Sequence, residues 1–512
     1  MKVLVIMLNN PGDIVMATSV VNRLINEAHD VSFLISEENR EIFENRNNSF
    51  NLLLYPRITI KSRFYNDNYL PKDILNDFIF SLKRENFDFI LNYYQGNESS
   101  VISILASNYE TSKIRGKFLD YDGIFKIKDI NTQYLYSIPF DRSLNNYHVI
   151  DIYNRIYNDN INNLTPMFLS INKENRDRLK KEVGENFVLM HISAAWESKR
   201  YPPYNWAKLI DLLKIEKIVF TATENEKRIE EEIYLNLEGD SYNIISMVGK
   251  TNKGDIIDLV SLAKVVITGD TFIMHIAAAL NKKIISLFSP SNFLETGPYV
   301  ENAFILKSKD DPFFYGSFDE KKGYLHLIEP ELIVDLVYED FSTLEEYNTY
   351  VFNTFFDDEY SWRVKPLNYK NTLKNKLPNA LTKKIYEAFI LKDYNKLLQF
   401  NINEIDLNLF QYKNELKELF KLREKLFILK EKIRRKEDTR DLLIEIDSIE
   451  KNLDKIFNKD LKYFLVAHRI TLNSLANKEY IDGYIQSINT LINRIIVMDN
   501  KGEKENGKIK NE

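Results

Sequence analysis

Three segments of this chain carry side chains of the types that bind or activate other molecules. In residues 265–290, an apolar run is followed by Gly-Asp-Thr, an alanine-rich run and a second apolar run. This order predicts a strand, a turn, a helix and a strand, with Asp270 and Thr271 where the helix starts. Because the first N–H groups of a helix lack partners and its dipole favours an anion, a phosphorylated ligand fits this point. The alternative is that Asp270 or Thr271 only caps the helix.

Two further segments follow predicted strands in the same way. Gly12 and Asp13 come shortly after the first apolar run, KVLVIML. Ligands of open α/β sheets bind at the carboxyl ends of the strands, where we expect Asp13, although an aspartate there also suits a helix cap. In residues 191–203, Lys199 and Arg200 follow the run NFVLMH. A lysine can neutralise phosphate as a mobile point charge and an arginine as a fork; the alternative is a solvated basic loop.

Repeated strand and helix patterns predict the elements that position these segments. Short apolar runs alternate with amphipathic helical patterns in residues 1–160, and the alternation starts again at Asn186. It is typical of parallel sheets, so we expect an α/β fold with two halves, residues 1–160 and 161–341. Beyond these, apolar residues that recur every three or four positions predict an all-α extension over residues 342–498. The polar residues 499–512 are expected to be disordered.

The composition limits the classes of function. With 512 residues, 44% of them hydrophobic and 28% charged, the chain has room for about three domains of an ordinary globular protein. It has no cysteine and a net charge of −6, which excludes disulfides and thiol nucleophiles and gives no global attraction to nucleic acid. No apolar run reaches the roughly 18 residues that span a bilayer, and we see no signal peptide, so we expect a cytoplasmic protein. Its chemistry must come from carboxylates, Lys, Arg, His and hydroxyl groups.

The order and spacing of four segments resemble the heptosyltransferases of glycosyltransferase family 9 over about residues 1–340. Gly-Asp at residues 12–13 resembles the family's N-terminal motif, and Tyr-Gln-Gly-Asn at residues 94–97 resembles its Leu-Gln-Gly-Asn segment. Residues 196–203 resemble Trp-x-x-Lys-x-Trp-Pro, and residues 270–290 resemble the signature Asp-Thr-Gly-Pro-Met-His-Leu-Ala-Ala-Ala-Leu. The resemblance implies two Rossmann-like domains that face each other across a cleft, the GT-B type of fold.

The resemblance also implies an activity: inverting, metal-independent transfer of a heptose or similar sugar from an ADP-sugar to a hydroxyl group of a lipopolysaccharide-type or other glycan. No cofactor is implied. Asp13 is then the base that deprotonates the acceptor hydroxyl, and Asp270 holds hydroxyl groups of the donor sugar. On the donor side the implied residues are Ser193, Lys199, Arg200, Glu224, Glu226, Thr251, Asp270, Thr271 and His275. On the acceptor side they are Gly12, Gln95 and His148.

The chemistry of such a transfer agrees with these residue types. An anomeric carbon that loses a diphosphate passes through an oxocarbenium-like state. That state needs a carboxylate on the acceptor side and positive charge at the leaving group. Asp13 supplies the first, while Lys199 and the helix start near Thr271 supply the second, and Ser193 is expected to help them stabilise the leaving group.

Three departures from the family pattern leave alternatives open. Phe272 and Ile273 stand in place of Gly-Pro, residues 191–194 replace Asn-Pro-Gly-Ala, and residues 221–223 replace a glycine-rich segment. One alternative is a transferase of the same fold that uses another nucleotide sugar or a protein acceptor. Another is a non-catalytic scaffold that acts through its helical extension. Residues 363–384 hold seven basic residues and no acidic one, which indicates either peripheral contact with the inner face of the cytoplasmic membrane or a lysine-rich linker.

Overall fold

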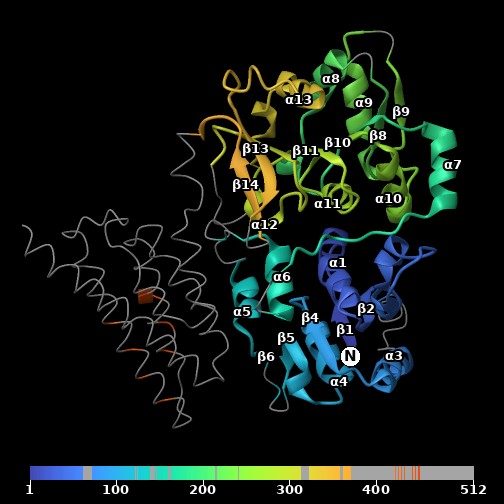
Figure 1. The fold of residues 1–512 in the computed structure, drawn as a ribbon, viewed down its shortest axis with the longest axis vertical. Helices are drawn as coiled ribbons and strands as arrows, with labels where there is room; N and C mark the ends of the chain where they lie inside the picture. The colour runs from blue at the N-terminus through green and yellow to red at the C-terminus, as the bar shows by residue number, and fades with distance from the viewer. Residues whose placement is uncertain are drawn as a thin grey trace, which may run out of the picture. The chain divides into compact units, whose positions relative to one another are not determined.

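The chain is organised around two α/β halves, each with its own sheet (Figure 1). We call them the first half, up to residue 158, and the second half, residues 173–370, with residues 163–172 as the segment that connects them. The computed structural model describes residues 1–61, 72–120, 123, 125–138, 145, 147–158, 163–213, 216–239, 242–312, 322–357 and 361–370, and single positions between 421 and 449. Among these residues, no helix is both long enough and apolar enough to cross a membrane.

The first half contains a six-stranded sheet in the order β3-β2-β1-β4-β5-β6. All neighbouring strands are parallel except β5 and β6. The strands are β1 (Lys2–Ile6), β2 (Asp30–Ser36), β3 (Asn51–Tyr55), β4 (Phe89–Asn92), β5 (Ile114–Leu119) and β6 (Phe125–Ile127). The described helices are α1 (Pro11–Asn26), α3 (Lys72–Glu85), α4 (Asn97–Ala106), α5 (Ile130–Ser137) and α6 (Val149–Tyr157), with 3-10 turns η1 (Glu37–Ile42) and η2 (Thr111–Lys113).

The second half contains an eight-stranded sheet in the order β14-β13-β12-β11-β10-β7-β8-β9. Its strands are β7 (Val188–His191), β8 (Ile218–Thr221), β9 (Ile244–Ser246), β10 (Val265–Gly269), β11 (Lys283–Leu287), β12 (Phe304–Ser308), β13 (Thr349–Phe356) and β14 (Trp362–Pro366). Its helices are α7 (Lys173–Val183), α8 (Pro203–Leu212), α9 (Lys227–Leu235), α10 (Lys253–Leu262), α11 (Phe272–Ala279), α12 (Phe293–Thr296) and α13 (Pro330–Tyr338). The 3-10 turns are η5 (Glu197–Lys199), η6 (Glu224–Glu226) and η7 (Leu325–Leu327).

The central strands are apolar because helices cover both faces of each sheet. In β1, all four residues from Val3 to Ile6 are fully buried, as are Val266 and Ile267 of β10. Such continuous hydrophobic runs are typical of parallel strands that are buried on both faces. The candidate residues Asp13, Lys199 and Asp270 lie outside these strands, in the segments that follow strand ends.

The second sheet continues past residue 341, which corrects the expected start of the all-α extension at residue 342. β13 pairs antiparallel with β12, and β14 pairs antiparallel with β13. The sequence of β13, TYVFNTFF, is rich in β-branched and aromatic residues, which favour a strand. Trp362 of β14 is buried, and its indole N–H donates to the carbonyl of Pro298 at 2.8 Å.

The remaining expectations for the C-terminal region are largely untested. The described positions between 421 and 449 are helical, and the tail at residues 499–512 lies outside the described residues. Of the basic residues in the stretch 363–384, Arg363 and Lys365 belong to β14. The domain boundary at residue 160 stays a prediction.

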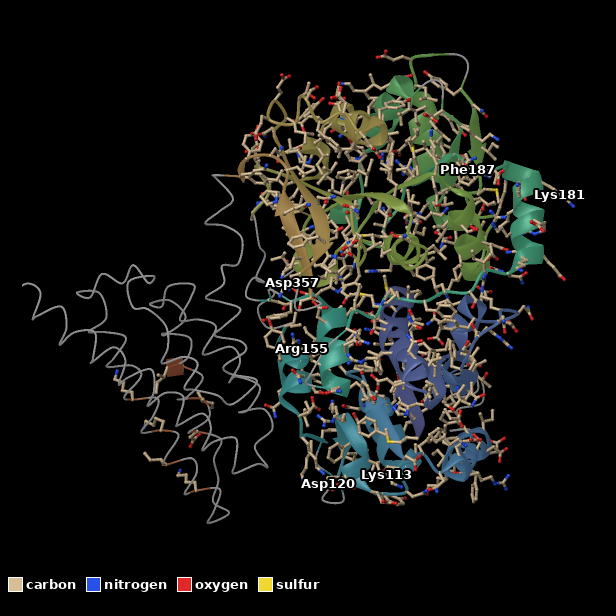
Figure 2. The ribbon with its side chains drawn as sticks, in the orientation of Figure 1. Lys113, Asp120, Arg155, Lys181, Phe187 and Asp357 are labelled. Atoms are coloured by element: carbon tan, nitrogen blue, oxygen red, sulfur yellow. The ribbon has the colours of Figure 1, made fainter. Side chains whose placement is uncertain are left out.

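The two halves meet along helices near the carboxyl ends of both sheets (Figure 1). Helix α1 packs against α11, and η1 packs against α10. On the α6 side, the hydroxyl of Tyr299 donates to Asp151 at 2.7 Å. Figure 2 shows Arg155 on α6 and Asp357 after β13 on opposite sides of this boundary. Segments distant in sequence are thereby brought together at one interface.

Candidate functional site

The start of α1 places the first candidate carboxylate at the interface. Pro11 is the first residue of the helix, which suits its fixed φ, and Asp13 is half-buried in the first turn. The N-terminal end of a helix carries partial positive charge and stabilises a nearby anion. The structure therefore positions Asp13 as expected, at the carboxyl end of β1.

Gly12 joins this helix start to the second half. A Cβ atom at Gly12 would lie 3.1 Å from Cδ2 of His275 and 3.9 Å from Cα of Phe272. Few real Cβ contacts are as short as the first of these distances, so the two helices approach this closely because residue 12 lacks a side chain. The close approach brings the residue next to Asp13 against α11.

Asp270 follows β10 and forms the charged centre of the second half. Its Oδ2 accepts a hydrogen bond from Nζ of Lys199 at 2.7 Å, and its Oδ1 accepts one from Thr296 at 3.3 Å. Burial raises the pKa of this carboxyl, but the nearby Lys199 ammonium, together with smaller contributions from His275 and Ser291, holds the pKa below its usual 3.8. The pair therefore holds an ionised carboxylate beside an ammonium group.

Thr271 does not cap α11 with its side chain. It occupies the N-cap position with extended backbone, yet its hydroxyl pairs with the hydroxyl of Thr268 at 2.9 Å and makes no capping hydrogen bond. The main bonds of Asp270 run to Lys199 and Thr296. The alternative interpretation of these two residues as mere caps is thus not confirmed.

His275 lies one turn into α11, between Gly12 and Asp270. Only 4% of its surface is exposed, and burial lowers its pKa to about 4, so the ring is neutral at neutral pH. Its Nδ1 is buried with no hydrogen-bond partner among the residues that the structure describes. A neutral imidazole with an unused nitrogen is thus placed where the two halves touch.

The loop after β7 carries Lys199 on the turn η5 and is held by its neighbour Arg200. The Nε of Arg200 donates to the carbonyl of Ala194 at 2.8 Å, and its NH2 lies 3.4 Å from Oε1 of Glu226. Ser193 of the same loop is buried. Arg200 thus supports the loop from within, rather than being a free fork.

The two acids among the donor-side residues that follow β8, Glu224 and Glu226, differ in their surroundings. Glu226 forms a capping box, because its Oε2 accepts from the hydroxyl of Thr223 at 3.0 Å as well as from the Thr223 N–H. The carboxylate of Glu224 instead is exposed and lies against Gly249, where a side chain would collide with it and where φ is +69°. Thr251, two residues further on, is half-buried. Glu224 is therefore the more available of the two acids.

On the acceptor side, Gln95 is exposed after β4. Its carbonyl accepts a hydrogen bond from Nζ of Lys117 at 3.2 Å, and the same Nζ donates to Oδ1 of Asn97 at 2.8 Å. The guanidinium of Arg57 lies over the ring of Tyr94, 5.4 Å from its centroid. These contacts hold the segment after β4 in place at the carboxyl edge of the first sheet.

His148, predicted on the acceptor side, is enclosed by other parts of the protein. The side chain is fully buried, its Nδ1 accepts from the Ile150 N–H at 3.2 Å, and its Nε2 donates to the Gly297 carbonyl at 2.8 Å. The ring packs against Tyr299 and Trp362, at centroid distances of 4.8 and 5.0 Å. Both nitrogens are therefore used to cap α6 and to join it to the second half.

A cavity of about 660 Å³ lies beside the β7 loop, in the second half. Its lining includes two predicted donor residues, Arg200 and Glu226, together with Ser198 and His326. Sequence reasoning missed Ser198 and also Thr296, which binds Asp270. Ser198 falls on an unspecified position of the Trp-x-x-Lys-x-Trp-Pro segment, and Thr296 lies outside the four motif segments, so the sequence carried no signal for either side chain.

The comparisons with known proteins agree with the motifs. The family model "Glycosyltransferase family 9 (heptosyltransferase)" matches residues 77–313. Lipooligosaccharide heptosyltransferase 2 of Haemophilus influenzae is 28% identical over 145 residues, which is 27% of this chain and 42% of that protein. The protein of the same name from Haemophilus ducreyi is 30% identical over 153 residues, 29% of this chain and 44% of that protein. The chain thus matches less than half the length of these curated relatives.

Among solved structures, the glycosyl transferase family 9 protein from Veillonella parvula superposes with a TM-score of 0.52 at 18% identity. The superposition covers 66% of this chain and 96% of that protein, and so concerns the fold. It confirms the predicted fold class of two Rossmann-like domains of the GT-B type. Residues 77–313 thus match the sequence model of glycosyltransferase family 9 (heptosyltransferase), and the chain has the fold of a solved protein of that family.

Proposed function

We propose that this protein is a glycosyltransferase that moves a heptose or similar sugar from an ADP-sugar to a hydroxyl group of a glycan acceptor, with inversion and without a required metal. The observation that carries the proposal is the Lys199–Asp270 ion pair at 2.7 Å, set beside His275 at the contact with Gly12. This arrangement supports a donor site in the second half and a base, Asp13, on the facing helix of the first half.

Each group of the site has a chemical role in the proposal. Asp13 takes the proton of the acceptor hydroxyl, whose oxygen then bonds to the anomeric carbon of the donor. The bond from that carbon to the diphosphate breaks, and Lys199 neutralises the departing oxygens. Donor phosphate can replace the carboxylate as the partner of Lys199, which leaves Asp270 to accept hydrogen bonds from the sugar hydroxyls.

Further residues complete the proposed donor site. Ser193, Thr271 and the first N–H groups of α11 take the diphosphate, while Glu224 binds the ribose because its carboxylate is the more available. Thr251 is the residue that we place near the adenine of the ADP-sugar. Arg200 and Glu226 act indirectly, since they bond to each other and to the loop that carries Lys199.

The acceptor and its location are also proposals. The family resemblance favours a lipopolysaccharide-type glycan, bound on the side of Gln95, and presentation of that glycan at the inner face of the cytoplasmic membrane. Arg363 and Lys365 of the basic stretch lie in β14, and the rest of its basic residues beyond Lys370 lie outside the described residues.

Two measurements test the proposed function. Calorimetry with ADP, UDP and GDP identifies the nucleotide, and Asp13→Ala tests the base. We expect Asp13→Ala to keep the affinity for ADP and to lower transfer by about 10²–10⁴-fold, the usual contribution of a general base. Asp73→Ala is the matched control, because Asp73 is also an aspartate in the first turn of a helix, α3, which packs on α4.

The outcomes separate the alternatives. Binding of UDP or GDP in place of ADP favours a transferase with another donor sugar. No binding of any nucleotide favours the non-catalytic scaffold, and full turnover by Asp13→Ala shows that Asp13 is not the base.

A further inference from the structure

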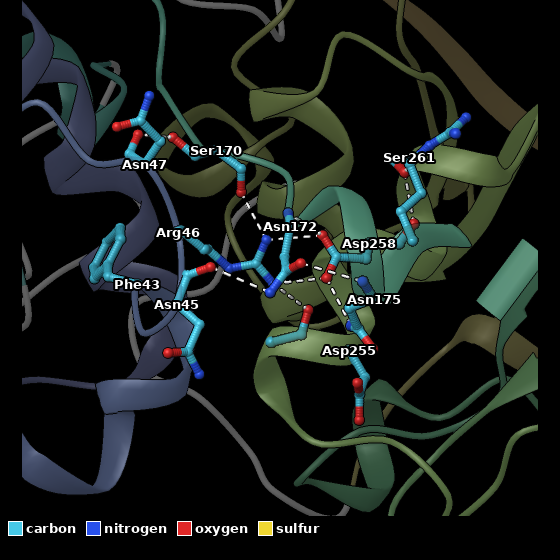
Figure 3. A network of polar contacts seen from close by, with 12 residues as sticks. Phe43, Asn45, Arg46, Asn47, Ser170, Asn172, Asn175, Asp255, Asp258 and Ser261 are labelled. Atoms are coloured by element: carbon cyan, nitrogen blue, oxygen red, sulfur yellow. Dashed lines mark hydrogen bonds and ion pairs between the residues drawn. The ribbon is translucent and has the colours of Figure 1, made fainter. Parts of the chain in front are cut away.

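A buried ion pair between Arg46 and Asp258 crosses the boundary between the halves, and neither residue is one of the proposed donor or acceptor residues (Figure 3). Arg46 belongs to the first half, after η1, and Asp258 belongs to α10 of the second half. The NH1 of Arg46 donates to Oδ1 of Asp258 at 2.8 Å, and its NH2 donates to Oδ2 at 3.0 Å. The side chains are 2% and 0% exposed. The contact is thus a bidentate ion pair that is buried away from solvent.

The same two side chains also hold the segment that connects the halves, residues 163–172. The NH1 of Arg46 donates to the Ser170 carbonyl at 2.7 Å, and its NH2 donates to the Gly254 carbonyl at 2.6 Å. Asp258 further accepts from the Asn172 N–H at 2.9 Å and from the Asn175 amide at 2.7 Å. First half, connecting segment and second half therefore share one network (Figure 3).

Neighbouring contacts tie the same places together. The hydroxyl of Ser170 donates to the Asn47 carbonyl at 2.7 Å, and the amide of Asn172 donates to the Asn45 carbonyl at 3.2 Å. Lys253 of α10 donates its Nζ to the Glu38 carbonyl at 2.5 Å. The loop after η1 is therefore held on both sides, by the connecting segment and by α10.

The geometry of this network restricts how the halves can be oriented. A planar guanidinium that bonds to both oxygens of a carboxylate has one favourable orientation, whereas a lysine at the same place binds as a point charge. Removing one member of such a pair leaves a buried charge without its partner, so alternative orientations of the halves that separate the pair are disfavoured.

We propose that Arg46 is a positioning residue that sets the distance between Asp13 on one half and the Lys199–Asp270 pair on the other. This inference rests on the proposed function, because it concerns transfer between groups held on different halves. Arg46 touches no proposed substrate residue, since its side-chain partners are Asp258 and the carbonyls of Ser170 and Gly254. It acts through the orientation of the halves.

The first test compares nucleotide binding with transfer in Arg46→Met. The proposed nucleotide site lies wholly in the second half, so affinity for ADP should change less than about twofold. Transfer requires both halves, and a misplacement of about 1 Å can cost about 100-fold in rate, so we expect kcat to fall by that order while the donor KM stays similar. Arg46→Lys keeps the charge but not the bidentate geometry, so its kcat should lie between that of Arg46→Met and that of the wild type.

Arg23→Met is the matched control for loss of a buried arginine. Arg23 is 2% exposed, and its carboxylate partner Glu27 lies one turn away in the same half. Arg23→Met should therefore lower the free energy of unfolding but leave the transfer rate unchanged. If Arg46→Met lowers kcat no more than Arg23→Met does, or loses ADP affinity in step with kcat, Arg46 has only a structural role and the inference is wrong.

A second test does not depend on activity. The chain has no cysteine, so Lys113→Cys and Lys181→Cys can carry two spin labels, one on each half (Figure 2). Pulsed electron spin resonance should give one narrow distance distribution in the labelled wild type and a broader or shifted one after Arg46→Met. An unchanged distribution overturns the inference. If the wild type binds no nucleotide, the proposed function fails, while this distance measurement still decides whether Arg46 orients the halves.

Discussion

Replacing Lys199 with methionine tests whether its ion pair with Asp270 is the centre of the proposed donor site. The two side chains are 16% and 11% exposed, with Nζ 2.7 Å from Oδ2. Breaking a buried ion pair costs about 3–5 kcal/mol, because the remaining charge stays buried without its partner. Since both groups keep some contact with water, we expect Lys199→Met to lower the free energy of unfolding by about 2–4 kcal/mol.

A double variant separates the cost of leaving Asp270 unpaired from the cost of losing the packing of the Lys199 side chain. Asp270→Asn removes the charge that Lys199→Met leaves unpaired. The combination Lys199→Met with Asp270→Asn should therefore regain about half or more of the stability lost in the single variant, which is non-additive behaviour of residues in contact. Both single variants and the double variant should lose transfer, because each lacks a side chain that the proposed donor site needs, whatever its stability.

The pH dependence of the free energy of unfolding provides an independent check on the role of Lys199. In the wild type, burial raises the pKa of Asp270, but Lys199, with smaller contributions from His275 and Ser291, brings the folded pKa below 3.8, so the stabilisation is lost only in strong acid. In Lys199→Met, burial is no longer opposed by Lys199 and the pKa rises. The carboxyl is then protonated in mild acid, and the destabilisation should be smaller at about pH 4.5 than at about pH 7.

The assay is denaturant unfolding followed by tryptophan fluorescence. All three tryptophans, Trp196, Trp206 and Trp362, lie in the second half, and Nζ of Lys199 is 5.1 Å from the ring centroid of Trp196. The reasoning is refuted if Lys199→Met unfolds within about 0.5 kcal/mol of the wild type, the range of ordinary surface substitutions. It is also refuted if the double variant is no more stable than Lys199→Met.

Three further predictions concern the contacts between and within the halves. Gly12→Ala should lower stability by about 1–3 kcal/mol, because its Cβ would lie 3.1 Å from the ring of His275; combining it with His275→Ala should reverse much of that loss, and calorimetric unfolding measures both. Burial lowers the pKa of His148 to about 3 from 6.5, so its contribution to stability is present above pH 6.5 and lost as the pH falls towards 3. Replacing His148 with leucine should therefore reduce the slope of stability against pH by about 1.4 kcal/mol per pH unit between those values, and an unchanged slope would contradict this account. A chain cut after Phe341 loses β13 and β14 with the buried Trp362, so it should not fold, whereas a chain cut after Lys370 should keep the circular dichroism of the two halves.

Local pattern was sufficient for the parts of this protein in which neighbours in sequence are neighbours in space. Continuous apolar runs such as Val3–Ile6 predicted buried parallel strands, and the turns after them predicted where Asp13, Lys199 and Asp270 lie. The order of the motifs predicted the resemblance to glycosyltransferase family 9, which the match over residues 77–313 confirms. These features depend on short-range periodicity and on spacing, both of which can be seen in a single sequence.

Tertiary structure alone decided which residues are partners and which are available. His148 has a motif-like position but is buried as a cap of α6, because Tyr299 and Trp362 close over it from the second half. The strands after residue 341 belong to the second sheet because β12 offers an edge to pair with. Arg46 and Asp258 are 212 residues apart, and only the packing of the two halves brings their charges into contact. The sequence determined the chemistry that each segment can offer, and long-range packing determined its partners, because hydrogen bonds and desolvation depend on what lies around a side chain.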